Sequence, residues 1–147
     1  MLVKPRVVKA LVSVLLALPA ASAWADRGAC FLSTEPLSFG TYVTGQLAPL
    51  DASTFVQVSC IDNSTKAIIK VDGGITGNNN SRRMLNGASR LSYDLYKNVQ
   101  RTDPVRNQLD KDSRAMTETI IVYGRIPAAQ DVVPGGYYDT LTLTVLP

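Results

Sequence analysis

Alternation of apolar and polar residues is the strongest pattern in this sequence. Several runs place an apolar side chain at every second position, which is the period of a β-strand with one buried face. These runs are Thr54 to Ile61, Ala67 to Asp72, Leu91 to Lys97 and Tyr138 to Val145. Thr119 to Gly124 is apolar on both faces, as in a central strand, and a shorter strand is expected around Leu37 to Phe39. The pattern predicts an all-β chain.

Turn-forming residues separate the predicted strands. Gly73-Gly74 and the run Gly77 to Asn80 mark one turn region, and Pro134-Gly135-Gly136 marks another. Residues 98–117 are polar and charged, so we predict a long connection there, with a short helical turn near residues 110–116. Short strands with frequent turns, and no amphipathic helix of ordinary length, favour an antiparallel β-sandwich in one domain.

The N-terminal residues have a different pattern. Three basic residues precede an apolar run from Ala10 to Leu18, and small residues follow it. This order is typical of a secretory signal peptide, and the apolar run is too short to span a bilayer. We predict cleavage after Ala25, which makes residues 1–25 the signal peptide and residues 26–147 the exported domain. Cleavage after Ala23 and a retained membrane anchor are the alternatives.

Removing the signal peptide changes the charge balance. The chain has 15 basic and 12 acidic residues, and three of the basic ones, Lys4, Arg6 and Lys9, lie in the signal peptide. The exported part therefore has a net charge near zero. It also has no segment in which clustered Lys and Arg residues alternate with aromatic residues. We predict no nucleic-acid partner and no membrane span in this part.

Two cysteines, Cys30 and Cys60, lie in the exported part. The oxidising environment outside the inner membrane favours a disulfide between them, and two free buried thiols are the alternative. Closing a loop of about 30 residues stabilises a chain by roughly 3.5–4 kcal/mol in the chain-entropy model. We therefore expect this bond to matter for the stability of a small domain.

Residues needed for common catalytic mechanisms are missing. The chain contains no histidine, which excludes Ser-His-Asp and Cys-His nucleophiles and zinc sites that need imidazole. Two cysteines cannot form a four-thiolate site, and they do not form a C-x-x-C motif. Nothing marks a pair of carboxylates placed across a sugar, because Glu35 and Glu118 are the only glutamates and most aspartates fall in turns or polar loops. We predict no catalytic residue, no cofactor, no metal site and no enzyme activity.

Several segments resemble the spore coat protein U family. Cys30 precedes a segment of the form L-x-F-G-x-Y, and the end of the chain contains Y-G-R-I-P-A-x-Q followed by a G-Y-Y-D-T-L-T-L-T-V strand. The final motif is specific, whereas the cysteine pair alone would be a weak signal. The matching segments are residues 37–42, 58–60, 83–85, 91–96, 123–130 and 136–145.

The resemblance implies a fold and a function. Members of this family look like subunits of archaic, Csu-type chaperone–usher pili, with an incomplete immunoglobulin-like antiparallel β-sandwich that lacks its last strand. A periplasmic pilus chaperone lends a strand to the open groove, and in the fibre the N-terminal extension of a neighbouring pilus subunit replaces it. The outer-membrane usher is the third implied partner. The chain is thereby expected to reach the cell surface through the periplasm.

The resemblance also implies where a donated strand would bind. The predicted acceptor groove runs along the final strand, with the predicted strand around Leu37 as its opposite wall. The expected groove residues are Leu37, Phe39, Leu141, Leu143 and Val145. The alternative is that these residues belong to a core that is already complete.

The predicted N-terminal extension is short. Only Asp26 to Ala29 precede Cys30, whereas a donor strand needs roughly ten extended residues at about 3.3 Å each. We therefore expect a subunit that accepts a strand but donates none, at or near the tip of a fibre. Two other functions remain open: a secreted spore-coat or extracellular-matrix protein that an usher does not polymerise, and, with weaker support, a carbohydrate-acting enzyme.

N-terminal sequencing of the exported protein tests the predicted cleavage site. We expect a mature chain that begins at Asp26, because small residues occupy the positions that a signal peptidase reads. A chain that begins at Trp24 would identify the alternative site. Recovery of the uncleaved chain in the membrane fraction would contradict the prediction.

Overall fold

The computed structural model describes residues 29–62, 66–111 and 114–146, so the predicted signal peptide lies outside the described residues. Within them the chain forms eight β-strands and one short 3-10 turn. These elements are β1 (Cys30–Thr34), β2 (Leu50–Cys60), β3 (Ala67–Val71), η1 (Gly74–Thr76), β4 (Arg82–Asn86), β5 (Ser89–Tyr96), β6 (Gln108–Lys111), β7 (Thr117–Ile126) and β8 (Leu143–Leu146). The prediction of an all-β chain is confirmed.

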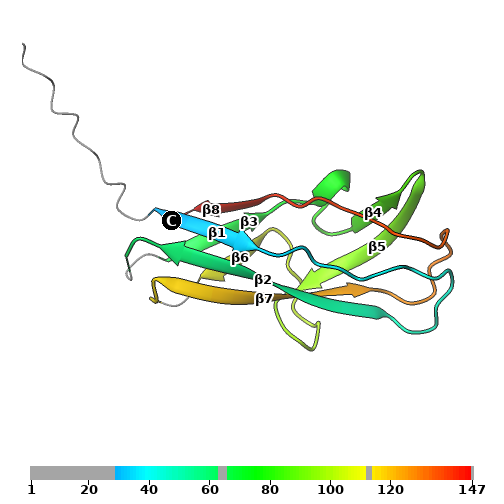
Figure 1. Cartoon of the computed structure of the whole chain (residues 1–147), viewed down its shortest axis with the longest axis horizontal. Helices are drawn as coiled ribbons and strands as arrows, with labels where there is room; N and C mark the ends of the chain where they lie inside the picture. The colour runs from blue at the N-terminus through cyan, green and yellow to red at the C-terminus, as the bar shows by residue number, and fades with distance from the viewer. Residues whose placement is uncertain (1–28, 63–65, 112–113, 147) are drawn as a thin grey trace, which may run out of the picture.

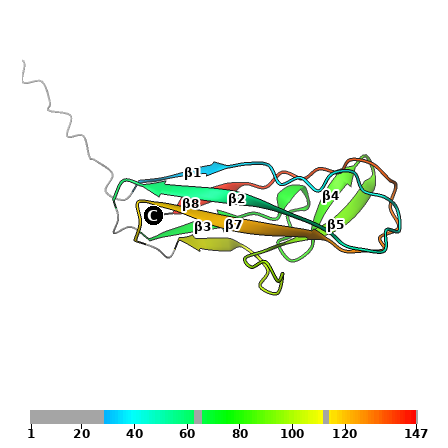
Figure 2. The ribbon, with the colours of Figure 1, turned by 60° about the horizontal axis from the view of Figure 1, so that its bottom comes forward.

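The strands form two antiparallel sheets. One sheet has the order β1-β2-β7-β5-β4, and the other has the order β6-β3-β8. β7 lies between β2 and β5, as its doubly apolar sequence predicts. Figures 1 and 2 show an elongated sandwich, in which β1 and β8 lie side by side near the C-terminal end of the chain. Each is an edge strand of its own sheet. The two sheets therefore meet at β1 and β8, and these two strands are not paired with each other.

The core lies between the sheets and follows the alternation in the sequence. In β3, Ala67, Ile69 and Val71 are buried, whereas Ile68 and Lys70 are exposed. The other strands that were expected from period-two runs contribute in the same way, since only one face of each sheet is covered. The buried apolar residues from the larger sheet include Val56, Val58, Met84, Leu91, Tyr93, Leu95, Val122 and Ile126.

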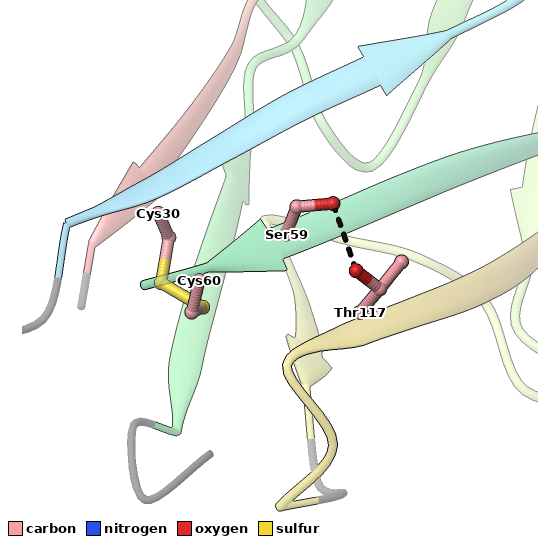
Figure 3. The surroundings of a disulfide bond; sticks show 4 residues. All are labelled: Cys30, Ser59, Cys60 and Thr117. Carbon is pink, nitrogen blue, oxygen red and sulfur yellow. Dashed lines mark hydrogen bonds between the residues drawn. A yellow bond between two sulfur atoms is a disulfide. The ribbon is translucent and has the colours of Figure 1, made fainter. Parts of the chain in front are cut away.

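A disulfide joins Cys30 to Cys60, as the sequence predicts. The two residues lie opposite each other where β1 pairs with β2 (Figure 3). Next to the bond, the hydroxyls of Ser59 and Thr117 form a hydrogen bond of 3.2 Å between β2 and β7. β1 has a strand partner on one side alone, so the covalent link holds this edge strand on the sheet.

The chain that follows β1 lies against β7 through two apolar side chains. A Cβ atom built on Gly124 of β7 would be 2.5 Å from Cζ of Phe39 and 2.7 Å from Cδ2 of Leu37. Real Cβ atoms essentially never come that close to another heavy atom. The absence of a side chain at Gly124 therefore lets Leu37 and Phe39 pack directly on the sheet.

Several predicted boundaries need correction. β2 begins at Leu50, four residues before the predicted start, because the chain pairs with β7 as far as Ile126. The expected strand around Leu37 is not a strand: the chain leaves β2 after Thr34 and continues without a strand partner. The final strand is shorter than predicted and covers Leu143–Leu146.

The polar region after β5 was also predicted incorrectly in part. Residues 108–111 form strand β6, which pairs with β3, so the expected helical turn does not begin there; residues 112–113 lie outside the described residues. Leu109 and Lys111 are both buried, and the charge of Lys111 hides the alternation. Strand β4 was missed for the same reason, because its first inward residue is Arg82.

Removal of the disulfide tests how strongly β1 depends on it. We expect a Cys30→Ala/Cys60→Ala variant to lose about 3–4 kcal/mol of unfolding free energy, since the open loop gains conformational entropy in the unfolded state. Urea denaturation measures the loss, and hydrogen exchange should show that β1 opens most. The control Ser59→Ala removes one surface hydrogen bond next to the disulfide and should change stability by about 0.5 kcal/mol or less. Equal stability of the double variant and the control would contradict the role of the bond.

Substitution of Gly124 tests the packing of the segment after β1. We expect Gly124→Ala to lower the unfolding free energy by about 1–3 kcal/mol, because the new methyl group overlaps Phe39 and Leu37. The matched control is Gly136→Ala, where a Cβ atom would have no other atom within 4 Å. Urea midpoints that are the same for both variants would show that the segment is not seated on Gly124.

Candidate functional site

A cavity of about 560 Å³ lies between two segments from opposite ends of the chain. One wall, here called the N-terminal wall, is formed by residues 34–37 and Phe39. The other, here called the C-terminal wall, is formed by residues 137–141 and Leu143. Figures 1 and 2 show that the blue chain after β1 and the red chain before β8 extend along the molecule to the same end, with opposite chain directions. Core residues of both sheets form the floor, among them Val56, Val71, Leu95, Val105, Leu109 and Val122.

Four of the five residues predicted for the groove line this cavity. Leu37 and Phe39 lie on the N-terminal wall, and Leu141 and Leu143 lie on the C-terminal wall. All four are half-buried and contact the core cluster. Val145 does not line the cavity; it is half-buried in β8, opposite Ile69 of β3. The fold thus brings together two short apolar patterns that are about 100 residues apart.

The backbone of the N-terminal wall has few partners. Within the described part of the chain, no hydrogen bond joins a backbone group of residues 36–41 to another backbone group. The carbonyl of Glu35 accepts hydrogen bonds from the hydroxyls of Thr34 and Thr54, which hold the start of the wall near β2. Beyond that point the wall is held by its side chains, so its backbone donors and acceptors are free to bind another strand.

The C-terminal wall is paired along one edge. Tyr138 exchanges two backbone hydrogen bonds with Leu85, and the carbonyl of Thr142 accepts one from the amide of Asp72. Successive backbone groups of an extended chain point to opposite edges. The groups of Leu141 therefore point away from β3 and β4, toward the edge that faces the N-terminal wall. Two incompletely paired edges flank an apolar cavity.

Backbone pairing joins the two walls beyond one end of the cavity, here called the closed end. Tyr42 and Gly135 form an antiparallel bridge with hydrogen bonds of 2.9 and 3.0 Å. The Tyr42 ring is buried, and its hydroxyl donates to the carbonyl of Gln130 and accepts from the amide of Gln130. At the opposite end β1 comes close to β8. The unpaired stretch therefore lies between two places where the walls approach each other.

One polar pair interrupts the apolar lining. The hydroxyl of Tyr93 donates a hydrogen bond of 2.6 Å to Oδ2 of Asp139. The amides of Ile75 and Thr140 donate to Oδ1 of the same carboxylate, at 2.7 and 2.8 Å. Burial, and then the hydrogen bond to Asp139, raise the pKa of Tyr93, so the hydroxyl stays protonated as a donor. Sequence reasoning missed this pair, since the two residues are far apart and belong to no local pattern.

Arg82 is a second buried polar residue that was missed. Its guanidinium donates to the carbonyls of Val105 and Arg106 at 2.7 Å, and it lies 3.8 Å from the Asp94 carboxylate. Burial lowers the pKa of Arg82. These contacts connect β4 to residues 105–106, just before β6. Val105 in this segment forms part of the cavity floor. Arg82 thus supports the cavity without lining it.

Among the residues that the structure describes, no three His, Cys, Asp or Glu side chains are grouped so that they could hold a metal ion. In that part of the chain, no helix has the length and apolar character needed to cross a membrane. The cavity between the two walls is therefore the candidate functional site.

A solved structure shares this fold. The chain is similar to a chain in the crystal structure of the CsuC–CsuE chaperone–tip adhesion subunit pre-assembly complex, from the archaic chaperone–usher Csu pili of Acinetobacter baumannii, with a TM-score of 0.54 and 21% identity. The match covers 80% of this chain and 39% of that chain, so this chain spans about two fifths of its length. The likeness supports an immunoglobulin-like antiparallel β-sandwich.

The sequence also matches a described family. No curated protein matches the chain. The Spore Coat Protein U domain matches residues 16–144, which include every strand except the end of β8 and overlap the last part of the predicted signal peptide. This match covers most of the sequence and agrees with the motifs around Cys30, Cys60 and the C-terminal strand. The chain therefore belongs to the Spore Coat Protein U domain family.

Proposed function

We propose that this chain is an exported structural subunit of a chaperone–usher pilus, and that a strand from another protein completes its sandwich. The observation that supports this most is the cavity between the N-terminal and C-terminal walls, where an apolar floor lies beside incompletely paired backbone edges. An open edge of this kind is a template for strand addition. The proposed site is the acceptor groove, with Leu37, Phe39, Leu141 and Leu143 at its sides.

Strand addition would satisfy two needs at once. The backbone of the added strand would bond to residues 36–41 on one side and to the free groups around Leu141 on the other. Its alternate side chains would fill the cavity. Each Å² of apolar surface buried in this way stabilises the complex by about 25 cal/mol. Because the two walls run antiparallel, the added strand must be parallel to one and antiparallel to the other. The groove thus fits an extended segment better than a compact ligand.

The partners follow from this mechanism. A periplasmic pilus chaperone would fill the groove first, the outer-membrane usher would catalyse exchange, and a neighbouring subunit would fill it in the fibre. The family match and the likeness to a chain in a chaperone–subunit complex support this assignment. The protein would then pass through the periplasm to the cell surface.

The tip of the fibre is the position that we propose for the subunit. If the signal peptide is cut after Ala25, four residues remain before Cys30, and they contain no alternating apolar pattern. Such a subunit accepts a strand but donates none, so it has a place only at an end of the fibre. Immunogold labelling along the shaft would contradict this position.

Periplasmic expression with and without the cognate chaperone tests the proposed function. We expect the exported chain alone to be degraded or to aggregate, and its soluble yield to rise at least about tenfold with the chaperone, because a ligand that binds only the folded state stabilises it. Leu141→Asp should abolish the rescue, since it places a charge in the groove. The control Thr144→Asp lies in β8 on an exposed position opposite Lys70 and should be rescued normally.

The opposite result would favour the second function considered from the sequence. A chain that folds cooperatively and stays soluble without any partner would contradict strand donation. It would favour a self-contained secreted spore-coat or extracellular-matrix protein instead.

A further inference from the structure

The carboxylate of Asp139 has an acceptor position that the described residues leave unused. A carboxylate offers about four lone-pair sites. Three are used: Oδ2 accepts from Tyr93, and Oδ1 accepts from the amides of Ile75 and Thr140. No Lys or Arg of the described residues forms an ion pair with Asp139. One site on Oδ2 therefore remains, on a half-buried residue that lines the cavity.

Asp139 also has a defined place along the groove. It is four residues from Gly135, which pairs with Tyr42 at the closed end. Tyr93 contacts Phe39 edge-to-face, with ring centroids 6.2 Å apart, and Phe39 is three residues from Tyr42. The polar pair thus lies nearer to the closed end, whereas Leu141 and Leu143 lie farther from it.

The closed end limits how a strand can enter. Seven residues, 35–41, separate the end of β1 from the Tyr42–Gly135 bridge, or roughly 23 Å at about 3.3 Å per residue. A strand in the groove cannot move past the Tyr42–Gly135 bridge unless the two hydrogen bonds of this bridge break. A strand that fills the groove as far as the bridge has its last residue at a fixed distance from Asp139, so one particular side chain faces this carboxylate.

The chemistry of that side chain decides whether Asp139 is satisfied. An apolar side chain would exclude water and leave the remaining acceptor of a charged group unpaired, which is costly. An acidic side chain would add like-charge repulsion. A hydroxyl, amide or ammonium group would complete the hydrogen bonding. A polar site of this kind also penalises wrong registers, because a shift by one residue turns every side chain to the other face.

We propose that Asp139 determines the specificity and register of the groove: it selects a donated strand that is apolar at alternate positions and presents a hydrogen-bond donor to Oδ2 near the closed end. This inference rests on the proposed function. The occupant is the N-terminal strand of a neighbouring subunit. A permanent junction benefits from one fixed register, whereas a chaperone strand is later exchanged.

Peptide binding to the exported chain tests the proposal without altering the protein. The chain, with its disulfide intact, is refolded with synthetic peptides of about eight residues that carry Val at alternate positions and Thr at the position facing Asp139. In matched peptides this Thr is replaced by Val or by Asp, or is moved to the next inward position. We expect the Thr peptide to bind about tenfold more tightly than the Val and shifted peptides, and the Asp peptide to bind most weakly.

The variant Asp139→Asn supplies a second readout. An amide keeps the size of the carboxylate but replaces Oδ2 by a donor, and because a Thr hydroxyl can also accept, the readout is a peptide with 2,4-diaminobutyrate at this position, whose ammonium group can only donate. The unaltered chain should prefer this peptide to the Val peptide, and the preference should disappear in the variant while the Thr peptide still binds. If this variant does not fold, the peptide series on the unaltered chain still decides the question.

The outcomes separate this inference from the proposed function. Equal binding of the Thr, Val and shifted peptides would overturn the role of Asp139 and leave the groove intact. Failure of every peptide to bind would overturn the proposed function as well. Peptides copied from the neighbouring subunit's extension and from the chaperone's strand identify the occupant. If binding of the chaperone peptide depends on the position of its hydrogen-bond donor, and binding of the subunit peptide does not, the assignment of the occupant to the neighbouring subunit is overturned.

Discussion

Unpaired backbone beside an apolar cavity is the constraint on which the rest of this structure depends. Backbone N–H and C=O groups must find partners when water is removed from them, and apolar side chains gain free energy when a neighbour covers them. Neither condition is fully met at the edge between β1 and β8. Residues 36–41 have no backbone partner among the described residues, and the apolar cavity beside them is not filled by side chains of the described residues. The same two deficits make this edge suitable for a strand from outside.

The fold holds the walls of this site in place before any strand arrives. The disulfide fixes β1 to β2 at one end, and the Tyr42–Gly135 bridge joins the walls at the other. Between these points Gly124 allows Phe39 to pack onto β7, so that side chains instead of backbone bonds position the N-terminal wall. A preorganised groove of this kind spends less conformational entropy when it binds a strand.

Asp139 links this frame to the chemistry of the groove. Its contacts reach the turn η1 and strand β5, so the C-terminal wall is anchored to this turn and to the larger sheet near the closed end. Charge inside an apolar groove weakens binding of a purely apolar strand and favours one with a matching donor. Under the proposed function, the polar and apolar parts of the groove have separate roles: the apolar part supplies affinity, and the polar part discriminates.

Local patterns in the sequence determined the all-β class, the inward face of β3 and β5 and the disulfide, because alternation and cysteine number are properties of short segments and of compartment. Resemblance added five expected groove residues, Leu37, Phe39, Leu141, Leu143 and Val145, of which the first four line the cavity. Tertiary structure alone decided that Leu37 lies outside any strand, that charged β4 and β6 join the sheets, and that Tyr93 meets Asp139. Pairing and register depend on contacts between distant segments, and the alternation within one segment does not specify its partner.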